Sequence, residues 1–506
     1  MKKYLWTIAA IAAIVVSGCQ QKEDEPVDET PAVLTSFKIL AADNEGLKED
    51  YAPASISESM VIRIPGGGQG KTLVATVSAG ENDVIKVNDA EVTDGKASFD
   101  ATYAVDIVVT NTKSKKSAQY EVKIGKILQL TSKKLGTFYC GSEMVYTESG
   151  FKAAVNPVSG EMYLAYNYTP ADGSLKNVGV VKFSNGQFVQ VGAEAIVPNP
   201  AAAVNHIGEI VFDKEGTPYV LYINGDVKNT FTIRKFDGSS WTNVGPVGFA
   251  TKPGTTGAPH MYFDENGNPG VIYFKSDRNC GVIYLEEGAW KDGSVSQLPP
   301  YVKNGEISSN QGCYWNSAIG TYNGKQYGIF SINAYGFYVY ELTGNQWSNM
   351  VVENFKPEGE DYALPGNLSI AYKGDKMLVF AALSNAKAMQ IYEFNGNGFT
   401  PYGASFPIGI GSSGSADPAR FGVNPVTGEI IAVKANSDKL IQFSSLNENK
   451  QWEDFTSLAD APATYTGIAF GFDKEGNALV VYPDAGRGTN GYHLYSIGLE
   501  DDVLPE

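Results

Sequence analysis

Three histidines are the residues of this chain best suited to acid–base or metal chemistry. His206 and His260 each lead into an apolar run that ends in an Asp-containing turn, so we expect them at equivalent positions of two repeats. Such a pair could bind a metal or transfer protons. Neither histidine has a carboxylate or cysteine at a fixed local spacing, so we assign no catalytic residue and no metal site. His493 has apolar neighbours on both sides and is expected to be structural.

Aromatic and planar polar side chains fall in two sets of loops, and they are our candidates for ligand binding. Aromatic rings pack on the C–H faces of a sugar, while guanidinium, imidazole and carboxylate groups bind its hydroxyls. Ordinary solvated loop residues remain the alternative for each of them. The loops leading into the first strand of a repeat contain His206, His260, Trp315, Arg420 and Tyr465, and those between its second and third strands contain Tyr168, Arg278, Tyr335, Asp438 and Arg487.

Two motifs suggest cofactors, but their residues match ordinary inter-strand loops more closely. The string from Pro65 to Thr72 ends in Gly-Lys-Thr like a phosphate-binding loop, but its first position is Pro65 and a strand-like run follows it instead of a helix. The turns that begin at Asp213, Asp264 and Asp473 lack the longer ligand series of a calcium loop. We therefore expect turns and loops between strands at all of these places, and no cofactor.

A repeat positions the candidate residues. Residues 206–245 predict four strands separated by turns, which is the content of one β-propeller blade. The turn between the first two strands recurs seven times, with its glycine at positions 160, 216, 267, 324, 374, 428 and 476. A period near 50 residues is typical of propellers. The seventh unit lacks a fourth strand, so we expect a segment just after residue 126 to supply it and to close the ring.

Each unit also has an aromatic residue after the turn that follows its third strand. We expect these aromatic side chains to cap the outer edges of the blades. Cys280 and Cys313 are expected in loops on the same face of neighbouring blades, so a disulfide between them is plausible, although sequence cannot establish it. Cys140 would then be the free thiol.

The N-terminus has the features of a targeting signal. Lys2 and Lys3 precede an apolar run that is too short to span a bilayer. Val16-Ser17-Gly18-Cys19 resembles a bacterial lipobox, which implies lipidation of Cys19 and a signal peptide over residues 1–18. The alternative is a signal anchor with an incidental cysteine. The charged segment over residues 19–32 predicts a disordered tether, and it resembles the export signal of Bacteroidetes-type surface lipoproteins. That resemblance implies an outer-membrane lipoprotein that faces the cell exterior.

Residues 33–125 predict a small β-sandwich, because six short strand-like runs are separated by Gly, Asn and Asp turns. The order of these runs resembles the Ig/cadherin-like domains of Bacteroidetes surface lipoproteins. The predicted fold is thus all-β: a small N-terminal sandwich followed by a seven-bladed propeller over residues 126–506. The repeats resemble uncharacterised propellers of such lipoproteins, and this likeness implies an architecture without an activity.

The formal net charge of −17 excludes nucleic acid as an expected partner, since phosphate binding needs a basic surface. We expect a non-catalytic surface lipoprotein whose propeller binds a glycan or a protein, within a nutrient-acquisition system. The alternatives are a propeller enzyme acting on polysaccharide, as a lyase or glycoside hydrolase, and an architectural spacer.

Overall fold

The computed structural model describes part of the chain and divides it into two compact units. The described residues are 28–139, 150–170, 175–197, 204–224, 230–250, 259–275, 279–297, 302–303, 306–307, 315–332, 336–359, 363–383, 386–409, 418–458, 467–483, 491–500 and 504–505. The first unit comprises Met1–Gln129 with Glu500–Glu506, and the second comprises Leu130–Leu499. No helix among the described residues is long and apolar enough to cross a membrane.

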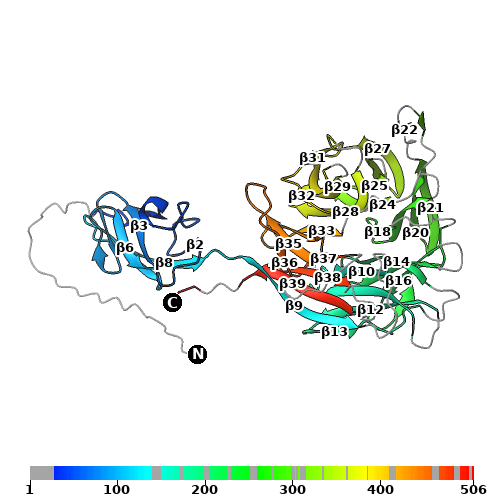
Figure 1. The fold of residues 1–506 in the computed structure, drawn as a ribbon, viewed down its shortest axis with the longest axis horizontal. Helices are drawn as coiled ribbons and strands as arrows, with labels where there is room; N and C mark the ends of the chain where they lie inside the picture. The colour runs from blue at the N-terminus through cyan, green and yellow to red at the C-terminus, as the bar shows by residue number, and fades with distance from the viewer. Residues whose placement is uncertain are drawn as a thin grey trace, which may run out of the picture. The chain divides into compact units, whose positions relative to one another are not determined.

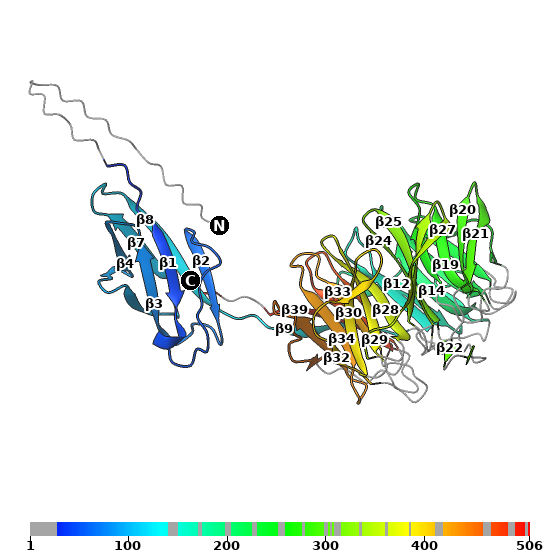
Figure 2. The same cartoon turned by 90° about the horizontal axis from the view of Figure 1, so that it is seen from above.

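The first unit contains two sheets, which can be followed in Figure 2. The three-stranded sheet has the order β1 (Leu34–Ile39), β3 (Thr72–Ala79), β6 (Lys96–Asp100). The five-stranded sheet has the order β2 (Ser59–Ile64), β8 (Ser117–Lys126), β7 (Val105–Asn111), β4 (Asp83–Val87), β5 (Ala90–Glu91). Alternate residues of both sheets are buried in one hydrophobic cluster, as period-two patterning predicts.

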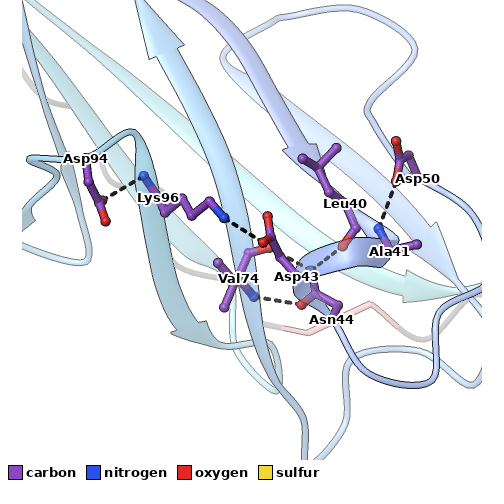
Figure 3. Close-up of polar contacts among 8 residues, drawn as sticks. All are labelled: Leu40, Ala41, Asp43, Asn44, Asp50, Val74, Asp94 and Lys96. Carbon is purple, nitrogen blue, oxygen red and sulfur yellow. Dashed lines mark hydrogen bonds and ion pairs between the residues drawn. The ribbon is translucent and has the colours of Figure 1, made fainter.

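A one-turn 3-10 helix, η1 (Ala41–Asp43), follows β1, and Figure 3 shows the contacts that anchor it. The buried amide of Asn44 donates to the carbonyl of Leu40 at 2.8 Å and exchanges two hydrogen bonds with the backbone of Val74 in β3. Lys96 forms an ion pair with Asp43. Asn44 therefore satisfies backbone groups of β3 that have no strand partner there.

The phosphate-loop lookalike of this unit is an inter-strand loop, as predicted. β2 ends at Ile64 and β3 begins at Thr72. The ammonium of Lys71 donates to the carbonyl of Pro65 at 2.8 Å, within the same loop. A strand instead of a helix follows the glycines, so this loop lacks the helix N-terminus that cradles phosphate.

The second unit consists of antiparallel sheets of the kind found in propeller blades. Its described residues form seven meanders of four strands, called sheets 1 to 7 below, and this confirms the predicted all-β class and the four-strand content of each repeat. Sheet 5 also contains β32 (Phe406–Pro407), and β22 (Val302–Lys303) pairs with β23 (Glu306–Ile307).

In chain order from sheet 1, the first strands are β10 (Phe151–Val155), β14 (Val204–Phe212), β18 (His260–Phe263), β24 (Trp315–Tyr322), β28 (Ala363–Lys373), β33 (Ala419–Val423) and β37 (Ala469–Phe472). The second strands are β11 (Met162–Tyr168), β15 (Pro218–Asn224), β19 (Pro269–Lys275), β25 (Lys325–Ile332), β29 (Lys376–Leu383), β34 (Ile430–Ala435) and β38 (Ala478–Pro483). The third strands are β12 (Asn177–Ser184), β16 (Phe231–Phe236), β20 (Asn279–Glu286), β26 (Phe337–Thr343), β30 (Ala388–Phe394), β35 (Ile441–Leu446) and β39 (Gly491–Leu499). The fourth strands are β13 (Gln187–Gln190), β17 (Trp241–Asn243), β21 (Ala289–Gln297), β27 (Gln346–Phe355), β31 (Phe399–Pro401), β36 (Thr456–Ser457) and, in sheet 7, β9 (Leu130–Tyr139).

The first strands of successive sheets contact one another in order. The series returns to its start, because β37 contacts both β33 and β10. Figure 1 shows the first strands grouped at the middle of this unit, with β21, β27 and β31 at its periphery. The fourth strand of sheet 7 comes from the start of the unit, since β9 pairs antiparallel with β39 from Leu130↔Leu499 to Tyr139↔Gly491. This confirms the prediction that a segment just after residue 126 supplies the fourth strand of the seventh sheet.

The tryptophans that follow the third strands connect neighbouring sheets instead of capping outer edges, which corrects the sequence prediction. The indole N–H of Trp241 in sheet 2 donates to the carbonyl of Val191 in sheet 1 at 2.7 Å. Trp290, Trp347 and Trp452 make the same kind of bond to a carbonyl of the preceding sheet. An indole is large enough to fill the space between two sheets, and its single donor then finds a backbone acceptor there.

The turns between first and second strands use Asn and Asp for backbone reasons. Asp213 accepts hydrogen bonds from the N–H groups of Glu215 and Thr217, and Asp264 and Asp473 act in the same way in their turns. Asn156 also reaches the next sheet, because its amide donates to the carbonyl of Gly216 at 2.8 Å. The carboxylates of these turns therefore stabilise the turns, as predicted.

Candidate functional site

One register position on the first strands defines a layer that all seven sheets share. Each of its residues pairs with the fourth residue of the second strand, which is buried in every sheet. The layer residues themselves are all half-buried. We call this set the inner layer; in sheet order it is Lys152, Glu209, His260, Ile319, Ile370, Arg420 and Ala469.

The inner layer has a polar side and an apolar side. Sheets 4 and 5 contribute Ile319 and Ile370, which are neighbours because β24 contacts β28. Sheets 6, 1, 2 and 3 contribute Arg420, Lys152, Glu209 and His260, with Ala469 of sheet 7 between the first two. Half-buried polar groups on the strands nearest the middle of the unit can bind a ligand, whereas the buried partners behind them hold the register.

Glu209 and His260 form a hydrogen-bonded pair within the inner layer. Oε1 of Glu209 lies 3.1 Å from Nδ1 of His260, and the side chains are 22% and 25% exposed. The other carboxylate oxygen accepts a hydrogen bond of 2.6 Å from the N–H of Met261. Because a carboxylate only accepts, Nδ1 of a neutral His260 carries the proton and Nε2 is its basic nitrogen. The carboxylate thus fixes the orientation and the tautomer of the imidazole.

His206 lies on the same strand as Glu209, in a basic environment. Its Nδ1 is buried and makes no hydrogen bond within the part of the chain that the structure describes. Burial, followed by the positive charges of Lys176 and Lys152, lowers the pKa of His206 below its ordinary value. His206 is therefore neutral at neutral pH.

This pKa shift makes stability depend on pH. The unfolded chain binds a proton at His206 near pH 6.5, but the folded chain binds it only at lower pH. The contribution of neutral His206 to the free energy of unfolding is therefore complete above about pH 6.5, the pKa in the unfolded chain. It is lost as the pH falls from there toward the lower pKa of the folded chain. We expect denaturant unfolding between pH 7.5 and 5 to show a decline that is shallower in His206→Gln, by at most about 1.4 kcal/mol per pH unit. Equal declines in both proteins would contradict this assignment.

The predicted equivalence of His206 and His260 is wrong. His206 pairs with Ile223, the sixth residue of β15, whereas His260 pairs with Ile272, the fourth residue of β19. The residue of sheet 2 that matches His260 is Glu209, because a register shift lies between Ile207 and Glu209. The two histidines therefore lie at different levels of the first strands.

The other predicted site residues are only partly brought together. Arg420 belongs to the inner layer, where Nη1 donates to the carbonyl of Ala419 at 2.8 Å. Asp438 is exposed in the turn after β34, as expected of a loop residue. Tyr168 is 4% exposed and packs in the hydrophobic core beside Tyr166, which corrects its expected place in a ligand-binding loop. Trp315 is the first residue of β24 and pairs with Ile332. The remaining predicted binding residues, Tyr465, Arg278, Tyr335 and Arg487, lie outside the described residues.

Cys280 is a free thiol, so the predicted bridge to Cys313 is corrected. Cys280 is the second residue of β20, not a loop residue, and its side chain is fully buried against residues of sheets 3 and 4. Its Sγ lies 3.4 Å from the carbonyl oxygen of Ser296, and burial raises the pKa of the thiol. Cys313, Cys140 and the lipidation candidate Cys19 lie outside the described residues. His493 is buried in β39, with its Nδ1 3.0 Å from Oγ1 of Thr137, which confirms its structural role.

Lys152 and Glu209 are members of the inner layer that the sequence analysis missed. The distance to the turn glycine could have identified Glu209, which stands seven residues before Gly216, as His260 stands seven before Gly267. His206 stands ten residues before Gly216. Among the described residues, no group of three His, Cys, Asp or Glu side chains could hold a metal ion.

No known protein-family model and no curated protein matches the chain. Solved structures with a similar arrangement include the BP39L lectin from Burkholderia pseudomallei, with 13% identity, a TM-score of 0.48, and coverage of 72% of this chain and 100% of that chain. The Dos1 propeller has 10% identity and a TM-score of 0.43, and covers 72% of this chain and 95% of that one. The α-L-arabinofuranosidase Arb93a from Fusarium graminearum has 14% identity and a TM-score of 0.37, with coverage of 57% and 91%. None of these is similar enough for its ligand or activity to be transferred to this chain.

Proposed function

We propose that the chain is a non-catalytic surface lipoprotein whose second unit binds a glycan at the inner layer. The observation that carries this proposal is the division of the layer into a polar and an apolar side. A sugar ring has the same two-sided character, with hydroxyls around its edge and C–H groups on its faces. The polar groups Arg420, Glu209 and His260 can bind hydroxyls, while Ile319 and Ile370 offer an apolar surface.

The architecture that we propose for this function is a seven-bladed propeller, with sheets 1 to 7 as its blades and β9 closing the ring. The ordered contacts of the first strands, including that of β37 with β10, support the closed ring. The two sheets of the first unit, which share one core, support a small β-sandwich that acts as a spacer. Lipidation of Cys19 after removal of residues 1–18 would anchor the chain in the outer membrane, facing outward.

A glycan array with a fragment of residues 28–506 tests the proposal. We expect binding of at least one glycan, and a loss of about tenfold in affinity when Arg420→Gln or Ile370→Ser removes a polar or an apolar contact. Lys214→Gln is the matched control, because Lys214 is exposed in the turn at the far end of the β14–β15 hairpin. An array without any bound glycan, or equal losses in all three variants, would refute glycan binding at the inner layer.

A second candidate function rests on the Glu209–His260 pair. A carboxylate that orients an imidazole through Nδ1 leaves Nε2 placed as a general base, which a polysaccharide lyase or a hydrolase requires. The same array ligands, incubated with the fragment, distinguish the two functions. New reducing ends, lost in His260→Gln, would establish an enzyme. Intact ligands would leave the pair with a binding role.

A further inference from the structure

The carboxylate of Glu209 joins sheet 2 to sheet 3 through two hydrogen bonds. One oxygen accepts a hydrogen bond of 2.6 Å from the backbone N–H of Met261, and the other lies 3.1 Å from Nδ1 of His260. Hydrogen bonds to a charged group are roughly twice as strong as neutral ones. Because both partners lie on β18, the carboxylate cannot turn away from this strand without losing two bonds. Its position is therefore fixed by the neighbouring sheet.

The two strands approach each other closely because the residue before Glu209 is a glycine. A Cβ on Gly208 would lie 2.9 Å from Cγ of Pro259, the residue that precedes His260. Glycine therefore permits a contact between β14 and β18 that a side chain would prevent. Glu209 and His260 each follow directly after a member of this contact, so the packing of the two strands brings them together.

The fixed tautomer makes Nε2 of His260 a hydrogen-bond acceptor. A carboxylate only accepts, so Nδ1 of the neutral ring carries the proton and Nε2 carries the lone pair. Within the part of the chain that the structure describes, Nε2 makes no hydrogen bond, and it is not one of the buried polar atoms that lack a partner. The side chain is 25% exposed. The lone pair of Nε2 is therefore open to a ligand.

An acceptor in this place distinguishes between the substituents of a sugar. A free hydroxyl can donate to Nε2, whereas an O-methyl ether has no proton to donate. A carboxylate or a sulfate ester also lacks that proton, and the negative charge of Glu209 repels it. A site that is built to hydrogen-bond a hydroxyl rejects analogues without one, because the polar atom of the site is then left unpaired.

We propose that His260 is the specificity-determining residue of the inner layer, and that its ligand is a neutral sugar whose unsubstituted hydroxyl donates a hydrogen bond to Nε2. Glu209 is the positioning residue that keeps Nε2 in the acceptor form. This inference rests on the proposed function and names the class of ligand. Sugars that carry an ether or an acidic group at this place bind more weakly than the parent sugar.

Glu209→Gln tests the role of the carboxylate with little change of shape. The carbonyl oxygen of glutamine can still accept from the N–H of Met261, but its amide nitrogen donates to Nδ1 of His260. The imidazole proton then moves to Nε2, which becomes a donor. Glu215→Gln is the matched control, since it makes the same change at a side chain that is 64% exposed in the turn of the β14–β15 hairpin.

NMR of the full-length chain in detergent, with nitrogen-15 in its histidines, reports the tautomer directly. At about pH 8.5, where an ordinary imidazole is neutral, we expect Nε2 of His260 to have the chemical shift of a nitrogen without a proton. The shift should change to that of a protonated nitrogen in Glu209→Gln and stay as it is in Glu215→Gln. His260→Phe identifies the resonance by its loss. A purely structural carboxylate would not move the proton, so an unchanged tautomer in Glu209→Gln would contradict the positioning role.

Calorimetry with the same proteins measures the preference for a hydroxyl. The probes are cellotetraose, laminaritetraose, mannotetraose and galactotetraose, each with its per-O-methylated form, which keeps the oxygen acceptors and loses the hydroxyl donors. We expect at least one parent sugar to bind at least about tenfold more tightly than its methylated form. This ratio should fall at least about fivefold in Glu209→Gln, whose Nε2–H can donate to a hydroxyl and to an ether alike, and in His260→Phe. Clashes of the methyl groups are the same in the wild type and in Glu209→Gln, so the change in the ratio isolates this hydrogen bond.

Each result decides the inference. A ratio that falls in Glu209→Gln and His260→Phe but not in Glu215→Gln supports it. A ratio that is equal in the wild type and all three variants would overturn it and leave glycan binding intact. If all the parent sugars fail to bind while the array detects another glycan, the inference is wrong and the proposed function stands. If the array is also empty, both are wrong.

Discussion

A fragment of residues 140–500 is expected to be unfolded, whereas a fragment of residues 127–500 is expected to fold. The difference between them includes the whole of β9, which is the fourth strand of sheet 7. Phe138 of this strand packs on Tyr166 and Phe188 of sheet 1, with ring centroids 4.9 and 5.7 Å apart. Removal of β9 therefore exposes the edge of β39 and also the flank of sheet 1.

The expected cost is comparable with the whole stability of an ordinary domain. Loss of the partly buried Phe138 side chain costs up to about 3 kcal/mol. The fragment also loses the ladder with β39 and the partly buried Leu130 and Leu135. Domains are stable by only about 5–15 kcal/mol. Thermal unfolding followed by circular dichroism measures the result. A cooperative transition of the shorter fragment at the temperature of the longer one would show that β9 does not close the unit.

Local signals account for the parts of this fold that the sequence predicted. Five of the seven first hairpins are closed by a short turn whose Asp or Asn accepts hydrogen bonds from its own backbone, as Asp213 and Asp264 do, and such turns are visible in the sequence. Apolar runs of strand length flank every turn. A hairpin forms between neighbouring segments of the chain, so the four-strand repeats could be predicted from the sequence alone. The seventh repeat lacks a fourth strand, and this absence pointed to β9.

The inner layer could not be predicted as a set, because the distance to the turn glycine differs between sheets, from four residues for Ile370 to eight for Lys152. In sheet 2 a bulge shifts the register further along the strand. Gly208 is the residue skipped between Ile207 and Glu209. A side chain on Gly208 would begin 2.9 Å from Pro259 of the next sheet and 3.0 Å from Leu221, so this close approach requires glycine. A bulge shifts the pairing register by one residue, so every residue beyond it faces a different partner. This bulge accounts for one residue of the error that placed His206 in line with His260; the rest is the level of His206 itself, which pairs with Ile223, two residues beyond the Leu221 that Glu209 faces.

Cys280 shows a second limit of prediction from the sequence, because the residue at which a strand begins is hard to locate. A loop cysteine on a shared face would favour a bridge, but β20 begins at Asn279, one residue earlier. Alternation along the strand then directs the side chain of Cys280 into the hydrophobic cluster between sheets 3 and 4. Strand boundaries are set by pairing with neighbouring strands, and Cys280 is paired with Phe274 on one side and Ser296 on the other. The residues around Cys280 in the sequence do not reveal these partners.

Trp241→Ala is expected to destabilise the second unit by about 3–5 kcal/mol, because it leaves a large cavity between sheets 1 and 2. Trp241 is 6% exposed and packs on Phe236 with ring centroids 5.5 Å apart. The backbone of Gly192 fits against the indole so closely that a Cβ there would lie 3.0 Å from Cδ1 of Trp241. Such tight contacts leave little freedom for the neighbouring sheets to collapse into the space.

The hydrogen bond of the indole can be separated from its volume. Trp241→Phe keeps an aromatic ring but leaves the buried carbonyl of Val191 without its donor, so we expect a smaller loss of about 1–3 kcal/mol. Tyr139→Ala, at a side chain that is 63% exposed, is the control and should change stability by less than about 0.5 kcal/mol. Urea unfolding measures all three variants. Equal losses for Trp241→Phe and Trp241→Ala would assign the effect to the hydrogen bond instead of the cavity. Since Trp290, Trp347 and Trp452 make equivalent bonds, the same ranking should hold at each of those junctions.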